Sequence, residues 1–208
     1  MTRRKRQSSR RPPERTPPER PQLRIVGGRF RGRKLIYGGD RRTRPMKDRL
    51  REAIFNLLGP AVRGKHAVDL FAGTGALGLE ALSRGAASAT LIERHFPTAG
   101  IIRQNVATLG VDDVARIVTS DVFIWRKRLP DLGSQPWVVF CSPPYDFYAD
   151  RTDEMLELIG GLVQSSPAES LFAVEADERF DFALLCDAGQ WGVRSYPPAV
   201  VGIYHKLP

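Results

Sequence analysis

The chain has 208 residues, 42% of them hydrophobic, which suits one globular domain of ordinary size with an appendage. It contains no apolar run near the roughly 18 residues of a membrane span and no signal-peptide core, so a membrane-embedded protein is not expected. Its charge is uneven, because residues 1–51 hold 19 Lys and Arg against 4 Asp and Glu, a net of +15, and the remainder carries −6.

The basic residues are concentrated in the N-terminal quarter, and this indicates contact with a polyanion, most often a nucleic acid. Residues 1–22 are rich in Arg, Pro and Ser and hold one apolar residue, Met1, so they are expected to be a disordered basic tail. A charged tail that only keeps the protein soluble is the alternative interpretation. The excess of charge continues past residue 22 into a segment with folded character, which favours the nucleic acid.

Residues 23–60 are predicted to form a small RNA-binding extension. The stretch LRIVGGRFRGRKLIYGG alternates β-prone runs, Leu23–Val26 and Lys34–Tyr37, with glycine- and arginine-rich connections, and predicts a hairpin-like module. The stretch RPMKDRLREAIFNLLG then shows apolar residues at helical spacing, and Gly59-Pro60 ends the helix. The candidate RNA contacts of this extension are Arg29, Arg31, Arg33, Lys34, Arg44, Arg49 and Arg51.

Residues 61–208 alternate strands with helices, which predicts an α/β domain with a mostly parallel sheet covered on both faces. Helices are expected after Gly75, around residues 99–109 and around residues 155–162. A closing hairpin is expected around Pro197-Pro198. The predicted strands are His66–Phe71, Ala89–Ile92, Ala115–Thr119, Trp137–Cys141, Ser170–Val174, Gly192–Tyr196 and Val200–His205.

The turn after the first strand of this domain has the pattern of a nucleotide-binding loop. Gly73-x-Gly75-x-x-Gly78 follows a strand and opens a helix, and Glu93 lies 20 residues beyond Gly73, where an acid can bind ribose hydroxyls. A tight turn without a ligand is the simpler alternative. Asp69, in the strand that enters the turn, would repel a pyrophosphate but attract the ammonium and sulfonium of S-adenosylmethionine. The charge therefore favours the methyl donor over a dinucleotide.

A third acid, Asp121, follows the third strand, where it could accept a hydrogen bond from an adenine amino group while Val122 or Phe123 packs on the ring. Each acid alone could be a helix cap or a turn residue, which is the commoner role of Asp. Three acids at the carboxyl ends of successive strands lie at the edge where open α/β sheets bind ligands. The full set of predicted cofactor-binding residues is Asp69, Phe71, Gly73, Gly75, Glu93, Arg94, Asp121 and Val122.

The fourth strand ends in a rigid corner, Ser142-Pro143-Pro144-Tyr145, which is predicted to be the catalytic segment. Two prolines cannot continue a ladder, and they leave carbonyl oxygens free to accept hydrogen bonds. The Ser142 hydroxyl and the Pro143 carbonyl could orient an exocyclic amine toward the methyl group. The Tyr145 ring offers a face for base stacking, an interaction of about 1–3 kcal/mol per base. A rigid surface turn is the plainer alternative.

The remaining reactive side chains do not suggest a metal site. Cys141 and Cys186 lack the spacing of a zinc site and favour a reducing, cytoplasmic setting. The histidines at 66, 95 and 205 are scattered along the chain. We therefore expect no metal.

Together these stretches resemble the class I S-adenosylmethionine-dependent methyltransferases. More narrowly, residues 23–206 resemble the bacterial 16S ribosomal RNA guanine-N2 methyltransferases of the RsmD type, through LRIVGGRFRGRKL, RPMKDRLREAIFNLL, VDLFAGTGALGLEALSRGA, LIER and CSPPY. The resemblance implies a Rossmann-like, seven-stranded sheet with an antiparallel last strand and donor contacts at Asp69, Gly73, Glu93 and Asp121. It also implies catalysis at the proline corner, and rRNA of an assembling or assembled small subunit as substrate. The expected working form is a cytoplasmic monomer.

Two positions depart from the family pattern: Ser142 stands where the family usually has Asp, and Met46 where it usually has Thr. Related enzymes with Ser or Asn at the corner act on adenine N6 or on glutamine side chains, so a DNA or RNA adenine-N6 methyltransferase and a protein-glutamine methyltransferase stay as alternatives. A non-catalytic RNA-binding assembly factor is a third. A nicotinamide oxidoreductase is disfavoured by Asp69 and by the lack of a proton-relay Tyr/Lys pair.

Overall fold

The computed structural model describes residues 23–38, 46–128 and 131–208. The predicted disorder of residues 1–22 and the proposed RNA contact Arg44 lie outside the described residues. The α-helices are α1 (Asp48–Leu58), α2 (Ala76–Ser83), α3 (Phe96–Leu109), α4 (Val122–Lys127), α5 (Phe147–Asp150) and α6 (Thr152–Ser165). The strands are β1 (His66–Asp69), β2 (Ser88–Glu93), β3 (Ala115–Thr119), β4 (Trp137–Cys141), β5 (Leu171–Asp177), β6 (Gly192–Tyr196) and β7 (Ala199–His205).

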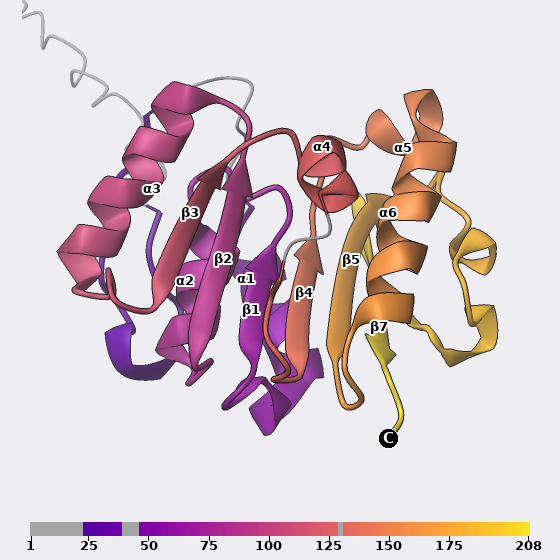
Figure 1. Cartoon of the computed structure of the whole chain (residues 1–208), viewed down its shortest axis with the longest axis horizontal. Helices are drawn as coiled ribbons and strands as arrows, with labels where there is room; N and C mark the ends of the chain where they lie inside the picture. The colour runs from indigo at the N-terminus through magenta and orange to yellow at the C-terminus, as the bar shows by residue number, and fades with distance from the viewer. Residues whose placement is uncertain (1–22, 39–45, 129–130) are drawn as a thin grey trace, which may run out of the picture.

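The seven strands form one sheet in the order β3-β2-β1-β4-β5-β7-β6 (Figure 1). Strands β1 to β5 are parallel, whereas β7 runs antiparallel to both β5 and β6. The chain order reverses between β1 and β4, so the carboxyl ends of these two strands flank the topological switch point. The predicted α/β fold, with its mostly parallel sheet and antiparallel last strand, is confirmed.

The strands at the centre of the sheet are buried on both faces, as the apolar runs of the sequence require. All five residues of β4 and the first six of β5 are buried. Strands β3, β4 and β6 have the predicted bounds, while β1 ends two residues earlier than predicted, because Leu70 and Phe71 already belong to the glycine turn. The short helices α4 and α5 were not predicted; at six and four residues they are too short for a helical period to show.

Helices cover the sheet on both sides and divide the core into two clusters. Ile54, Leu79 and Ile102 of α1, α2 and α3 pack on one face, together with Ala67 of β1 and Phe140 of β4. Helices α4, α5 and α6 cover the other face, and α4 and α6 stand in front of the sheet in Figure 1. This arrangement leaves the carboxyl ends of the strands, at the top of Figure 1, as the edge where the loops gather.

The N-terminal segment adds to the first of these clusters. Leu23, Ile25 and Leu35 are at most 6% exposed and belong to the same cluster as α1, α2 and the sheet. In place of the two predicted strands there is a single antiparallel bridge between Arg24 and Lys34, closed by a 3-10 turn at Gly28–Phe30. The segment is hairpin-like: three backbone hydrogen bonds join its two arms, and its backbone also donates to Glu80 and Ser83 of α2 and to Asn105 of α3.

Candidate active site

The glycine turn joins β1 to α2 at the carboxyl edge of the sheet. Gly73 and Gly75 have positive φ, 52° and 79°, a conformation that side chains with a Cβ rarely adopt. Gly78, in the first turn of α2, packs against β2, and a Cβ there would come within 2.9 Å of Leu91 Cδ2. The turn can therefore hold its shape only with glycine at these positions.

Asp69 ends β1 beneath this turn and is 1% exposed. Its Oδ2 accepts the backbone amide of Gly78 at 3.0 Å, while its Oδ1 is buried without a hydrogen-bond partner among the described residues. Burial, helped by the nearby charge of Glu93, raises the pKa of Asp69 to about 7. The backbone amide of Phe71 lies close enough to lower this pKa, although it does not complete a hydrogen bond to Oδ1. A buried carboxylate of this kind favours a cationic partner, so Asp69 could hold the ammonium-bearing end of a methyl donor.

Glu93, at the end of β2, holds the other side of the turn. Its Oε2 accepts the amide of Gly73 at 2.9 Å and its Oε1 accepts the amide of His95 at 2.7 Å. Each carboxylate oxygen has two lone pairs, so both can still accept a ribose hydroxyl. Glu93 thus holds the shape of the turn and could at the same time accept a ribose hydroxyl.

Asp121 caps a helix, which is one of the two roles that the sequence left open for it. Its Oδ1 accepts the amides of Phe123 at 2.9 Å and Ile124 at 3.4 Å, so it is the N-cap of α4. Both bonds end on the same oxygen, so the cap does not use Oδ2. Val122, the first residue of α4, is 4% exposed and belongs to the core cluster on this face of the sheet.

Three phenylalanines gather beside the turn: Phe71 from the turn itself, Phe123 from α4 and Phe147 from the start of α5. Phe71 lies 5.9 Å from Phe147 and 6.4 Å from Phe123, measured between ring centroids, and both pairs meet edge to face. The guanidinium of Arg151 stands 3.9 Å from the centroid of Phe123, and that of Arg94 is 5.7 Å from Phe147. The structure therefore brings the predicted residues Phe71 and Arg94 together, and adds Phe123, Phe147 and Arg151 to their surroundings.

The proline corner adjoins the turn because β4 pairs with β1. The register places Phe140 beside Asp69, two residues before Ser142. Pro143 is buried and Pro144 is exposed. The Pro144 carbonyl accepts the amide of Phe147 at 2.9 Å, whereas no described residue donates to the Pro143 carbonyl. The carbonyl oxygen of Pro143 is therefore available to accept a hydrogen bond, and this is the oxygen that was predicted to face an amine.

Sequence reasoning missed Glu175, which is the residue that binds the corner. This carboxylate lies on β5, is 7% exposed, and accepts hydrogen bonds from the Ser142 hydroxyl and, at 2.7 Å, from the Tyr145 hydroxyl. The signal was present, because Glu175 is an acid inside the otherwise apolar run LFAVEA. The predicted strand ended at Val174, which placed the acid outside the sheet.

The proposed RNA contacts divide into exposed residues and one buried residue. Arg29, Arg31, Arg33, Lys34 and Arg49 are exposed. The prediction that Arg51 contacts RNA is wrong, because its side chain is 0% exposed. It is ion-paired to Asp48 at 2.9 Å and to Glu80 at 3.7 Å, and it donates to the carbonyl of Arg24. A guanidinium bound inside the protein in this way cannot reach a phosphate.

Three of the exposed arginines lie at the opposite end of the domain from the glycine turn. The Gly28–Phe30 turn packs on Ser83, the last residue of α2, and Arg33 donates to the carbonyl of Thr108 near the end of α3 at 2.7 Å. Helix α3 has 14 residues and so spans about 21 Å from the carboxyl edge. In Figure 1 the indigo turn accordingly lies at the lower left, away from the loops at the top.

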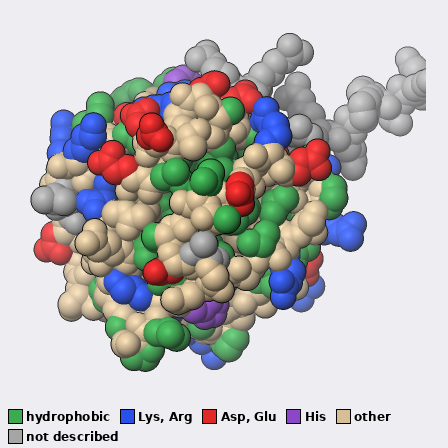
Figure 2. Space-filling model, turned by 90° about the vertical axis from the view of Figure 1, so that its right-hand side faces the viewer, with side chains coloured by type: hydrophobic (Ala, Val, Ile, Leu, Met, Phe, Trp, Pro, Cys, Tyr) green, Lys and Arg blue, Asp and Glu red, His purple; other side chains and the backbone are tan. Residues whose placement is uncertain are grey.

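The right-hand side of the molecule differs from this basic segment. Figure 2 shows acidic, basic and hydrophobic side chains interspersed there, without a broad area of one sign. Among the described residues, by contrast, the N-terminal segment 23–38 holds five Arg and Lys and no acidic residue.

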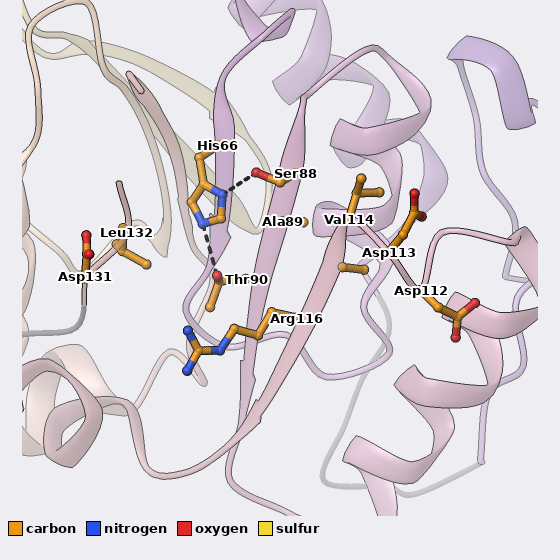
Figure 3. A pocket seen from close by; sticks show the side chains of 11 residues that line it. His66, Ser88, Ala89, Thr90, Asp112, Asp113, Val114, Arg116, Asp131 and Leu132 are labelled. Carbon is orange, nitrogen blue, oxygen red and sulfur yellow. Dashed lines mark hydrogen bonds between the residues drawn. The ribbon is translucent and has the colours of Figure 1, made fainter. Parts of the chain in front are cut away.

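A cavity of about 580 Å³ lies near the amino ends of β1, β2 and β3 (Figure 3). It contains none of the predicted site residues, and the two ring nitrogens of His66 are engaged by Ser88 Oγ at 2.7 Å and Thr90 Oγ1 at 3.0 Å. Within the described ranges, no cluster of three or more His, Cys, Asp or Glu is arranged to hold a metal. Each described helix is too short or too polar to cross a membrane.

The sheet order, the glycine turn at its switch point and the acids at its edge define an α/β protein of the class I methyltransferase architecture. A solved RNA methyltransferase from Salinibacter ruber, in complex with S-adenosyl-L-homocysteine, shares this fold at 16% identity, with a TM-score of 0.56 over 79% of this chain and 94% of that one. Residues 23–182 match the family model described as conserved hypothetical protein 95. The chain belongs to this family, that of the RsmD-type methyltransferases.

Two relatives from Escherichia coli support this assignment. The ribosomal RNA small subunit methyltransferase D of strain K12 is 41% identical over 157 residues, which is 75% of each chain. A solved putative methyltransferase, yhhF, is 33% identical and superposes with a TM-score of 0.73, covering 89% of this chain and 98% of that one. The resemblance stated from the sequence is confirmed.

Proposed function

We propose that this chain is an S-adenosylmethionine-dependent methyltransferase that modifies the exocyclic N2 amine of a guanine in 16S rRNA. Support comes from the family, from relatives that carry the name of small-subunit rRNA methyltransferases, and from the site. The observation that carries the proposal is the pairing of β1 with β4, which places the buried carboxylate of Asp69 next to the strand that ends in the proline corner.

The residues at the carboxyl edge fit the methyl donor in charge and in hydrogen bonding. Asp69 would receive its ammonium through Oδ1, Glu93 its ribose hydroxyls, and the backbone of Gly73 and Gly75 would allow its close approach. Phe71, Val122 and the second oxygen of Asp121 would surround its adenine. The donor supplies a methyl group on a positively charged sulfur, which a nitrogen lone pair can attack.

The chain's own task is to position a weak nucleophile. The lone pair of a guanine N2 amine is delocalised into the ring, so orientation and exclusion of water must supply most of the acceleration. The Pro143 carbonyl and Ser142 Oγ would accept the two amine hydrogens, and Tyr145 would stack on the base. The proton becomes acidic as the nitrogen gains its methyl group, so a strong base is not required.

The RNA would be held by the exposed basic residues Arg29, Arg31, Arg33, Lys34 and Arg49, with Arg44 and the basic tail 1–22 as further phosphate contacts. Because Arg29, Arg31 and Arg33 lie at the far ends of α2 and α3, the RNA must extend along the outside of these helices. This suits a large substrate such as a small-subunit particle or its assembly intermediate. We propose a cytoplasmic monomer as the working form.

The test is to incubate the chain with methyl-labelled donor and undermethylated 30S subunits, free 16S rRNA or DNA, and to identify the labelled nucleoside by mass spectrometry. The expected product is N2-methylguanosine in ribosomal RNA. Label on adenine N6 would show that Ser142 marks a different base specificity, and label found only on DNA would overturn the ribosomal assignment. Binding of the donor without any transfer would support the non-catalytic assembly factor.

A further inference from the structure

We infer that Glu175 is the positioning residue of the proline corner, and that its carboxylate makes up for the absence of an acid at position 142. This inference rests on the proposed function, since it concerns the amine that Ser142 and Tyr145 would orient. The sequence alone left Ser142 as a neutral and weaker acceptor. The structure places a buried carboxylate directly behind it.

The hydrogen-bond directions decide what Glu175 does to Ser142. An ionised carboxylate can only accept, so the Ser142 hydroxyl must donate its hydrogen to Glu175 Oε2. The hydroxyl oxygen then has no hydrogen to offer an incoming amine and presents lone pairs only. A hydroxyl that donates to a carboxylate is also more polarised than one that donates to water, because charge-assisted bonds are stronger. Ser142 is thereby fixed as an acceptor.

The same carboxylate fixes the ring on which a base would stack. The Tyr145 hydroxyl donates to Glu175 Oε1 at 2.7 Å, so each oxygen of the carboxylate holds one residue of the corner. One side chain thus sets the distance between the acceptor and the aromatic ring. A base that stacks on Tyr145 finds the Ser142 oxygen at a defined place beside it.

Glu175 is itself held rigidly by its neighbours. It lies in β5, which pairs with β4 on one side and with β7 on the other, opposite Val201. Its backbone carbonyl accepts the hydroxyl of Tyr148 at 3.0 Å. The Cys141 thiol next to the corner has its pKa raised by burial to about 12, so it stays protonated and does not compete as a charged acceptor.

The experiment compares Glu175→Gln with the wild-type chain, with Glu178→Gln as the matched control because Glu178 is exposed and follows the last residue of β5. The glutamine amide has the same shape but must donate to one of the two hydroxyls, which reverses the direction of that bond. We expect kcat to fall about 10- to 100-fold, the decrease that follows from removing a charge-assisted bond. The donor Kd by calorimetry is expected to change less than about twofold, since Asp69 and Glu93 are untouched.

A double-mutant cycle separates positioning from mere structural support. If Glu175 acts through Ser142, then Glu175→Gln in a Ser142→Ala background is expected to cost less in kcat than it does alone, and the cost that remains is the part that acts through Tyr145. Additive decreases, or full activity in Glu175→Gln, would overturn the inference. If the wild-type chain binds the donor but transfers nothing to RNA, the proposed function fails first, and the role of Glu175 fails with it. A lower urea midpoint shared by Glu175→Gln and Glu175→Asp, with kcat unchanged, would leave Glu175 as a stabilising residue only and would also overturn the inference.

Discussion

Arg51 of α1 and Glu80 of α2 form an ion pair in which both side chains are completely buried, with Nε and Oε2 3.7 Å apart. Glu80 also accepts the amide of Val26 at 2.8 Å and the Nε of Arg84 at 2.8 Å. One carboxylate therefore ties the N-terminal segment, α1 and α2 to each other. The basic segment is an integral part of the fold around this pair.

Removing the Glu80 side chain should lower the free energy of unfolding. Glu80→Ala leaves the guanidinium of Arg51 buried beside an empty space, and breaking a buried pair on one side typically costs about 3–5 kcal/mol. The measurement is urea unfolding followed by circular dichroism. Glu52→Ala is the control, because Glu52 is exposed on α1. Equal destabilisation of the two variants would show that the buried pair adds nothing.

Two glycines in the basic segment offer a matched comparison. Gly28 and Gly32 both have positive φ, 72° and 84°, so an alanine at either is disfavoured by a similar amount of about 1 kcal/mol. A Cβ at Gly28 would come within 2.0 Å of the Ser83 carbonyl oxygen, whereas at Gly32 nothing lies within 4 Å. Gly28→Ala is therefore expected to lower the free energy of unfolding by about 1–3 kcal/mol more than Gly32→Ala. Similar values in urea unfolding would contradict the close packing of this turn on α2.

The raised pKa of Asp69 makes stability depend on pH. Between the ordinary value of 3.8 and about 7, the folded chain keeps the proton that the unfolded chain has released. Raising the pH through this window therefore favours the unfolded state, by up to about 1.4 kcal/mol per pH unit. Asp69→Asn, which keeps an acceptor oxygen for Gly78, should gain stability relative to the wild type as pH rises from 4 to 7.

Urea unfolding of the wild type and of Asp69→Asn, at steps of half a pH unit, measures the difference between their free energies of unfolding. The contributions of the other titrating groups cancel in this difference. A difference that does not change with pH would show that Asp69 titrates normally. In the same variant, the donor should bind at least about 10-fold more weakly at pH 8, since the charge that attracts its ammonium is gone.

The two hydroxyl-bearing residues of the corner should differ in importance. Ser142→Ala removes one acceptor and is expected to slow turnover modestly, by about 10-fold. Tyr145→Ala removes a stacking surface of about 1–3 kcal/mol together with the bond to Glu175, so its turnover should fall further. Steady-state methylation of rRNA measures both. Full activity in Tyr145→Ala would rule out base stacking at this position.

The basic turn, which is the Gly28–Phe30 turn with Arg29 and the adjoining Arg31, should contribute to RNA affinity but not to the rate of methyl transfer. Arg29→Ala combined with Arg31→Ala is expected to weaken the salt dependence of RNA binding. The slope of the logarithm of the association constant against the logarithm of the salt concentration should decrease in magnitude by about 0.7–0.9 for each phosphate that the protein no longer neutralises. The donor Kd and the single-turnover rate at saturating RNA should stay as in the wild type, since the turn packs on the far end of α2, about 12 Å from the glycine loop along that helix. Arg194→Ala is the control, because Arg194 is exposed on β6 at the other edge of the sheet. An equal effect of this control would mean that any positive charge on the surface suffices.

The sequence alone determined the class of fold, and it supplied most of the residues that are proposed for the site at the carboxyl edge. The strand and helix periods, the glycines at 73, 75 and 78, the acids at 69 and 93 and the proline corner are local patterns, and each follows from the backbone or charge of its own few residues. Strand bounds were predicted to within a few residues for the same reason. Asp121 left two roles open, and the structure shows it capping α4.

Only the tertiary structure decided which distant side chains meet. Glu175 reaches Ser142 because β5 lies beside β4, and Arg51 is buried because α1 packs against Glu80 of α2. The basic turn lies at the amino edge because the ends of α2 and α3 hold it there. These contacts join residues about 30 or more positions apart, and their energy depends on burial and direction, which no local pattern of residues encodes.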